Sequence, residues 1–72
     1  MTNTVELKRI IKISGLKYKV IAEKLGITYY ALQKKINNIN EFKASEISIM
    51  CNMLNIKDSN LKEKIFFATH VE

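Results

Sequence analysis

Residues 16–36 read LKYKVIAEKLGITYYALQKKI, and this stretch decides which fold the chain can adopt. Its apolar residues recur at helical spacing, which predicts two short amphipathic helices over residues 18–25 and 29–37. The inward-facing residues are Ile21, Ala22 and Leu25 in the first of these helices and Leu32 and Ile36 in the second. Gly26 follows the first helix directly, where a residue without a Cβ can take the left-handed conformation that ends a helix.

The turn between these two helices has the residues that a helix-turn-helix needs. Ile27 can fill the angle between the helices, and the Thr28 hydroxyl can accept a hydrogen bond from a backbone N–H in the first turn of the second helix. Ala22 is small enough to let the two helix axes approach closely. In a helix-turn-helix the second helix can lie in the major groove of DNA.

The rest of the sequence predicts three more helices, and so a compact all-α domain of five helices. The first spans residues 4–14: Asn3 can cap it, Glu6 can complete a capping box, and Gly15 ends it. The fourth spans residues 44–55, and a short fifth helix follows. Their inward residues are expected to be Leu7, Ile10, Ile11, Ile47, Met50, Met53, Leu54, Leu61 and Ile65.

The connections and the ends of the chain complete this organisation. Asn37 and Asn38 are expected to end the third helix, and Ile39 and Phe42 to anchor the following loop to the core. Asp58 or Ser59 can cap the fifth helix. Strand-like alternation is absent, so residues 1–72 are treated as a single domain in which residues 67–72 form a frayed tail.

The composition limits the classes of protein to which the chain can belong. Its hydrophobic fraction of 47% is ordinary for a globular domain, and no apolar run is long enough to span a membrane. The N-terminal residues lack the apolar core of a signal peptide, so a cytoplasmic protein is expected. Cys51 is the single cysteine, and its neighbours Met50, Met53 and Leu54 indicate a small buried hydrophobe and not a redox sensor.

Positive charge is concentrated on the predicted helix-turn-helix. Residues 17–35 hold five lysines and one acid, Glu23, whereas residues 40–64 hold four lysines and four acids. A cationic face binds a phosphate backbone by releasing its counterions. The alternative is a lysine-rich surface that is merely solvated, but the coincidence with a helix-turn-helix favours nucleic acid.

The outward side of the second helix of this pair carries the candidate base-reading residues Tyr29, Tyr30, Gln33 and Lys34. Gln33 can pair with adenine N6 and N7, and Lys34 with guanine O6 and N7 or with a phosphate. The tyrosines offer hydroxyls to bases or phosphates and ring edges to a thymine methyl group. Two alternatives stay open: Tyr30 packs partly on the core, or Gln33 and Lys34 only solvate the helix.

Residues around this helix are candidate contacts to the DNA backbone, because ammonium, hydroxyl and amide groups donate to phosphate oxygens. They are Lys17, Tyr18, Lys19, Thr28, Lys35, Asn38 and Asn40. Lys17, Lys19 and Lys35 are expected to meet phosphates and not bases. Asn38 can alternatively be no more than a turn residue.

No group of residues suggests catalysis, a metal or a cofactor. His70 is the single histidine, and it has no second histidine or suitably placed cysteine with which to bind a metal. No glycine-rich phosphate loop is present, and the carboxylates lie near lysines as they do on solvated helix faces. The sequence therefore predicts that the protein is not an enzyme, and it suggests no small-molecule substrate.

One pattern runs through most of the chain: Gly15, Leu16, residues 21–28 and Leu32, continued by residues 34–38, 41–42 and 45–47. This pattern resembles the Cro/phage-repressor (XRE-type) helix-turn-helix family, and in particular small Cro-like regulators of Gram-positive phages and prophages. The resemblance covers about residues 5–56. It implies a lambda-repressor-like fold and a transcriptional repressor. It also implies DNA contacts by Thr28, Tyr29, Tyr30, Gln33 and Lys34, with Tyr18 as an anchor.

Several positions depart from the pattern of that family. Lys17 and Tyr18 stand where Ser or Thr commonly caps the second helix, and the lost cap costs ~1 kcal/mol of local stability. Lys43 stands where a capping Thr or Ser is common, so Glu46 lacks its partner in a capping box. Asn38 stands where glycine is usual.

The resemblance also implies a homodimer, at least on DNA, that binds a palindromic operator. Phe66 and Phe67 are the candidate dimer contacts. Two adjacent aromatic residues do not readily both face the core of one helix, which leaves one of them for a partner. The alternative is that both are partly buried against the first helix. The competing function is a protein-binding helical module, such as an antirepressor or adaptor, and RNA binding is a third option that lacks an aromatic sheet surface for stacking bases.

Overall fold

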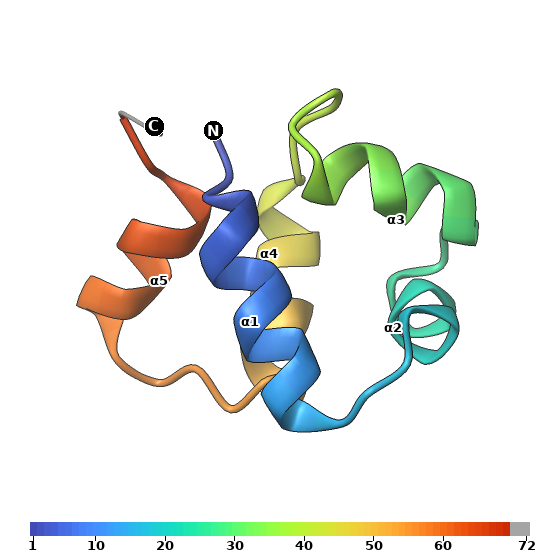
Figure 1. Ribbon diagram of the computed structural model, residues 1–72, viewed down its shortest axis with the longest axis horizontal. Helices are drawn as coiled ribbons and strands as arrows, with labels where there is room; N and C mark the ends of the chain where they lie inside the picture. The colour runs from blue at the N-terminus through green and yellow to red at the C-terminus, as the bar shows by residue number, and fades with distance from the viewer. Residues whose placement is uncertain (70–72) are drawn as a thin grey trace.

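In the computed structural model, which describes residues 1–69, the chain forms five α-helices and the all-α prediction is confirmed (Figure 1). They are α1 (Thr4–Ser14), α2 (Tyr18–Leu25), α3 (Tyr29–Ile36), α4 (Ala44–Met53) and α5 (Ser59–Phe66). The bounds of α1 and α2 are those predicted, whereas α3 and α4 end slightly earlier than expected.

Local chemistry explains where the first three helices begin and end. Gly15 and Gly26 follow α1 and α2 with φ of 78° and 72°, the left-handed conformation that favours glycine. Asn3 Oδ1 accepts a hydrogen bond from the Glu6 N–H, and Thr28 Oγ1 accepts one from the Ala31 N–H. Both predicted side-chain caps are therefore formed.

The predicted capping box of α1 is only half present, because the cap side chain forms its bond and Glu6 does not. In α4, where no capping box is predicted, the complementary half is present. The Glu6 carboxylate binds Arg9, and the Asn3 N–H donates to the Ile65 carbonyl instead. In α4, Glu46 Oε1 accepts a hydrogen bond of 2.8 Å from the Lys43 N–H. Because the backbone N–H is the donor, this half forms with a lysine at the cap position.

The core lies between all five helices. α4 packs against α2, while α1 packs against both α3 and α5. The side chains with no exposed surface come from every helix: Leu7, Ile21, Leu32, Ile36, Met50 and Ile65. Phe42 anchors the loop after α3 as predicted, but the prediction for Ile39 is wrong, since 68% of that residue is exposed.

Figure 1 shows α3 and α5 on opposite sides of the molecule, with α1 between them and α4 behind α1. The molecule measures 28 × 25 × 21 Å along its principal axes. None of the helices within residues 1–69 has the length and apolar character needed to cross a bilayer.

The segment expected to fray makes backbone contacts in the part that the structure describes. The Phe67 N–H donates to the Glu63 carbonyl, and the Ala68 N–H donates to the Met1 carbonyl. His70 and the last two residues lie outside the described residues.

Candidate nucleic-acid interface

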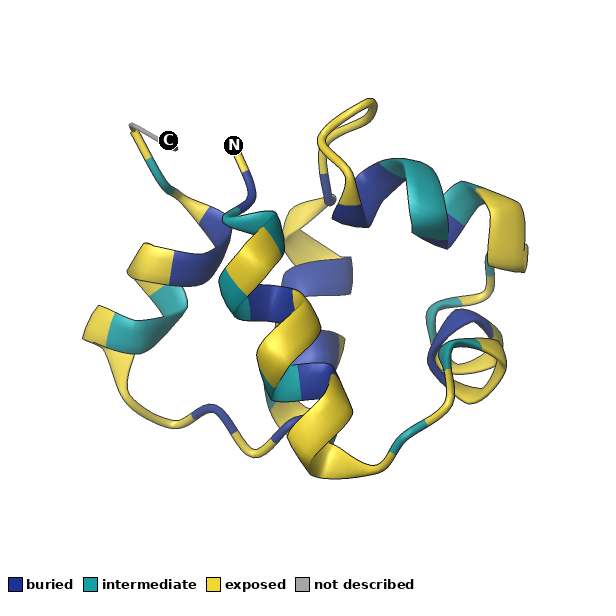
Figure 2. Ribbon diagram, viewed as in Figure 1, coloured by how far each residue is buried: buried dark blue, intermediate teal, exposed yellow. Residues whose placement is uncertain are grey.

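α3 separates a buried side from an exposed side. Leu32 and Ile36 have no exposed surface, whereas 55% of Tyr29 and 69% of Tyr30 are exposed. Gln33 and Lys34 are half-buried and continue the outer side. Figure 2 shows that the first turn of α3 is among the exposed parts of the molecule. The alternative in which Tyr30 packs on the core is therefore wrong.

Aromatic contacts order the side chains on this surface. The ring centroids of Tyr18 and Tyr29 are 6.3 Å apart, which brings the first residues of α2 and α3 together. Lys34 Nζ lies 4.7 Å from the centroid of the Tyr30 ring, one helical turn away. Such cation–π contacts restrict the conformations of both side chains. The four candidate base-reading residues thus lie along one side of α3, with Tyr18 next to its first turn.

The Thr28 hydroxyl is in a position to donate one hydrogen bond as well as to accept one. Its Oγ1 accepts a hydrogen bond of 3.0 Å from the Ala31 N–H, and the residue is exposed. A hydroxyl that accepts one hydrogen bond keeps its own proton for donation. The first turn of a helix also presents N–H groups and the positive end of the helix dipole. An anion beside Thr28 would therefore meet the hydroxyl proton and the positive end of α3.

The lysines that flank this surface are mostly available to a polyanion. Lys17 and Lys19 are exposed and form no ion pair within residues 1–69. The one acid of this stretch, Glu23, is exposed as well. The charge that the sequence concentrates here therefore stays at the surface, where it can interact with phosphates.

Lys35 departs from this pattern, and its predicted place at the phosphate backbone is corrected by the structure. The residue is only 9% exposed, and its Nζ lies 2.6 Å from Glu46 Oε1. Lys35 precedes Ile36 on the side of α3 that turns toward α4, and the carboxylate at the start of α4 neutralises its charge. Burial alone would raise the pKa of Glu46, but the hydrogen bonds from Lys35 and from the Lys43 N–H bring it below its usual value.

Asn38 and Asn40 lie in the loop after α3 and are used differently. Asn38 has a left-handed backbone with φ of 66°, as expected of a turn residue. Its side chain bonds the backbone of Thr2 in both directions, so the amide that was expected to donate to phosphate is occupied. Asn40 is exposed and remains available on this loop.

The two phenylalanines at the end of α5 have different surroundings. Phe66 is 3% exposed and meets the Phe42 ring edge-to-face, with the centroids 5.6 Å apart. It is therefore the core residue of the pair, and it is removed from the candidate dimer contacts. Phe67 is 49% exposed, so it alone of the pair presents a large apolar surface.

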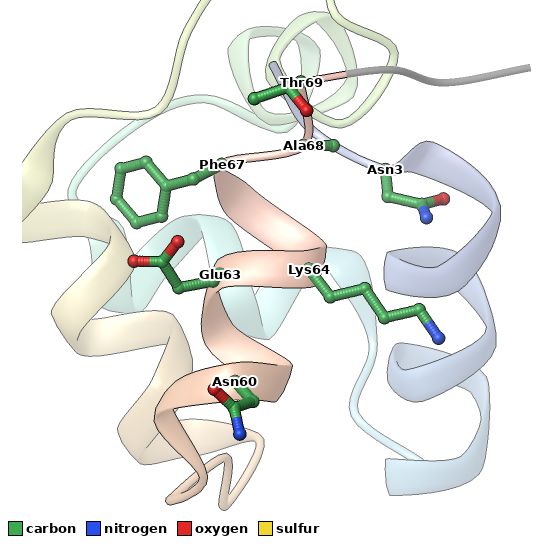
Figure 3. A pocket seen from close by; sticks show the side chains of 7 residues that line it. All are labelled: Asn3, Asn60, Glu63, Lys64, Phe67, Ala68 and Thr69. Carbon is green, nitrogen blue, oxygen red and sulfur yellow. The ribbon is translucent and has the colours of Figure 1, made fainter.

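A surface depression near Phe67 lies apart from α2 and α3. Figure 3 shows that its lining side chains come from α5, from the residues after it and from Asn3. Its polar groups come from Asn3, Asn60, Glu63, Lys64 and Thr69. On α4, burial raises the pKa of the half-buried Cys51 thiol, which keeps it in its less reactive neutral form.

Two features of this region were not predicted from the sequence: the Lys35–Glu46 ion pair and the bonding of residues 2–4 to the end of α3. Thr4 Oγ1 donates to the Ile36 carbonyl over 2.6 Å, and Thr2 is 3% exposed. A lysine directly before an inward isoleucine, together with a lone acid in the first turn of another helix, is a signal that could have suggested the ion pair.

Comparison of the chain with protein-family models, with curated proteins and with solved structures gives no match.

Proposed function

We propose that this chain is a sequence-specific, double-stranded DNA-binding regulator of transcription. In this proposal α2, the turn at Gly26 and α3 act as a helix-turn-helix within a lambda-repressor-like fold. The observation that carries the proposal is the outer, polar side of α3. It consists of the exposed Tyr29 and Tyr30 and the half-buried Gln33 and Lys34, opposite the fully buried Leu32 and Ile36.

Base reading is assigned to those four residues. Gln33 offers one donor and one acceptor to adenine in the major groove, and Lys34 offers a donor to guanine. The contact of Lys34 with the Tyr30 ring favours a limited set of positions for its ammonium group. Tyr29 and Tyr30 offer hydroxyls and ring edges, the latter to thymine methyl groups.

Phosphate binding is assigned to the flanking groups: Lys17, Tyr18, Lys19, Thr28 and Asn40. The exposed ammonium groups of Lys17 and Lys19 contribute affinity that is independent of sequence and sensitive to salt. Thr28 can donate its hydroxyl proton beside the positive N-terminus of α3. Lys35 and Asn38 are left out because their side chains are occupied within the protein.

The resemblance to Cro-like regulators supports two further parts of the proposal: a repressor of a phage or prophage that acts in the bacterial cytoplasm, and a homodimer on a palindromic operator. Linking two half-sites in one dimer multiplies the weak affinity of each. The exposed Phe67 is the candidate dimer contact. No catalytic activity and no cofactor are proposed.

A pair of alanine substitutions tests the assigned roles. Gln33→Ala is expected to flatten the preference of the protein among duplex sequences. Lys19→Ala is expected to weaken binding about evenly across sequences and to lower the slope of log affinity against log salt by ~1. Lys64→Ala, a lysine substitution on α5 across the molecule, is the matched control and should change neither quantity. Equal effects of Gln33→Ala and Lys19→Ala on sequence preference would contradict the assignment.

The second candidate function is a helical module that binds another protein. The observation in its favour is the exposed Phe67 ring, which lines a surface depression together with Ala68 and side chains of α5. The exposed side of α3 argues for DNA, because it is polar and cationic. This second function would be favoured by two results together. The wild-type protein would bind no duplex DNA, and a variant that lacks the side chains of Tyr29, Gln33 and Lys34 would still bind a protein partner.

A further inference from the structure

The first residues of the chain bond to two different helices at once. We call residues 1–4 the N-terminal strap. On one side, the Asn3 N–H donates to the Ile65 carbonyl over 2.7 Å, and the Met1 carbonyl accepts from the Ala68 N–H over 2.9 Å. These contacts attach the strap to the end of α5.

On its other side the strap bonds the end of α3. The Thr2 N–H donates to Asn38 Oδ1 over 2.7 Å, and Asn38 Nδ2 donates back to the Thr2 carbonyl. The Thr4 hydroxyl donates to the Ile36 carbonyl in the last turn of α3. The alternation arises because the N–H and C=O of one residue in an extended chain point to the same side and those of the next residue to the opposite side, and Asn3 is extended with φ −78° and ψ 93°. Figure 1 shows the strap running between the end of α5 and the loop after α3.

Asn38 has the chemistry that this position needs. Its backbone is left-handed with φ of 66°, a conformation that asparagine tolerates better than most residues. Its amide supplies an acceptor and a donor side by side, which matches the N–H and C=O of one extended residue. Aspartate would supply acceptors only, and glycine would fit the backbone but supply nothing. Thr2 is 3% exposed, so its peptide groups would be costly to leave unpaired.

We propose that Asn38 is a positioning residue that couples the end of α5 to α3 through the N-terminal strap. The strap orients the last turn of α3, and a disturbance at either end changes the order of the other end. Asn38 acts through Thr2 and does not itself contact DNA. The effect on DNA binding rests on the proposed function, whereas the coupling within the free protein does not.

Asn38→Gly tests the proposal, with Asn55→Gly as the matched control. Asn55 is also left-handed, with φ of 58°, and lies after α4, and its side chain makes no hydrogen bond within residues 1–69. Both variants keep the backbone conformation, which glycine adopts without strain. Only Asn38→Gly removes the bonds to Thr2, so a difference between the two variants reports on the strap.

Amide hydrogen exchange in the free protein gives the first readout. In Asn38→Gly, relative to Asn55→Gly, the Thr2 and Ala68 amides are expected to exchange about tenfold faster through local opening. Ala68 makes no hydrogen bond to Asn38 within residues 1–69, so faster exchange at Ala68 that is not shared by the amides of the core helices reports transmission along the strap. Asn38→Asp keeps the acceptor for the Thr2 N–H and should fall between the two. If the Ala68 amide exchanges equally fast in Asn38→Gly and Asn55→Gly, the proposed coupling between the end of α5 and α3 is overturned.

Affinity for duplex DNA gives the second readout. Asn38→Gly is expected to bind a selected duplex about three- to tenfold more weakly than Asn55→Gly. Equal affinities of the two variants would overturn the positioning role. A wild-type protein that binds no duplex overturns the proposed function instead, and the exchange of Ala68 then decides the coupling by itself. Weaker binding with wild-type exchange at Ala68 would mean that Asn38 contacts phosphate directly, which also overturns the proposal.

Discussion

Lys35 and Glu46 face each other at the junction of α3 and α4, and the pair shows how one contact removes a cation from the surface proposed to face DNA. The ammonium and carboxylate groups are 2.6 Å apart, with side-chain exposures of 11% and 7%. Removing one partner of such a buried pair typically costs about 3–5 kcal/mol, because the other charge is left without compensation. Replacing both partners with apolar residues of similar size often costs far less.

The first prediction concerns the salt dependence of DNA binding at Lys35. The double variant Lys35→Met/Glu46→Leu is expected to stay folded and to bind duplex DNA with an unchanged slope of log affinity against log salt, because the ammonium of Lys35 meets Glu46 and not a phosphate. Titrations of a labelled duplex at several salt concentrations measure this slope. A decrease by ~1, as expected for Lys19→Ala, would place Lys35 at a phosphate after all.

The second prediction concerns the dependence of stability on pH. The pKa of Glu46 is lower in the folded state than its ordinary value of 4.5, so folding favours the ionised carboxylate. This contribution to stability is fully present above that ordinary value and is lost as the pH falls through the folded pKa. Glu46→Gln is therefore expected to lower the free energy of unfolding at neutral pH and to reduce its decline under acid, as measured by urea unfolding at several pH values.

Glu6→Gln is the control for that experiment. The hydrogen bond from Arg9 lowers the pKa of Glu6 too, but Arg9 is exposed. Exposed ion pairs contribute little to stability. If Glu6→Gln reduced the decline of the free energy of unfolding under acid as much as Glu46→Gln does, the special role of the buried pair would be contradicted.

At the scale of the helices, α2 is the one in the proposed motif that starts without a side-chain cap. Lys17 occupies the cap position and makes no capping hydrogen bond, whereas Thr28 caps α3. Lys17→Thr is expected to stabilise the protein by ~1 kcal/mol, and Thr28→Ala to destabilise it by a similar amount. Urea unfolding measures both. Equal stability of Lys17→Thr and the wild type would show that another interaction already satisfies the start of α2.

The helices of this chain could be predicted from the sequence because their ends carry their own signals. Gly15 and Gly26 end α1 and α2 in left-handed conformations, and Asn3 and Thr28 begin α1 and α3 with side-chain caps. These signals act over three or four residues and do not depend on the rest of the fold. The end of α4 has no such glycine, and there the prediction ran two residues too far, to Asn55 in place of Met53.

The side on which each residue of a helix lies was harder to predict. Helical periodicity identified Leu32 and Ile36 as inward residues, but Lys35 lies at the edge of that stripe, where its direction depends on a partner in another helix. Glu46 supplies that partner from eleven residues away. Ile39 was misassigned for a related reason: hydrophobicity alone cannot show which apolar residue of a loop is buried, and here Phe42 is 8% exposed whereas Ile39 is 68% exposed.

At the scale of the whole molecule, the proposed DNA-reading side of α3 and the exposed ring of Phe67 lie in separate regions. Phe67 follows α5, which is across the molecule from α3 (Figure 1). A dimer formed through Phe67 would therefore leave both copies of α3 free to enter successive major grooves, provided that the half-site spacing fits.

Substitution of the two phenylalanines separates association from folding. Phe67→Ser is expected to change the free energy of unfolding little, since 49% of the residue is exposed, and to weaken cooperative binding to a two-half-site duplex. Phe66→Ala is expected to cost about 3–5 kcal/mol of stability, because the ring is buried against Phe42. Sedimentation and DNA titration measure association. Unchanged cooperativity in Phe67→Ser would exclude this residue as the dimer contact.

The most direct test of the proposed function is selection of binding sequences from random duplex DNA, followed by titration of the selected and scrambled duplexes at two salt concentrations. We predict a palindromic consensus that the protein binds ~10³-fold or more tightly than scrambled DNA, with a preference that persists when salt weakens both. Weak binding without a consensus, abolished by salt, would contradict the proposal and leave the lysines around α3 as a purely electrostatic surface.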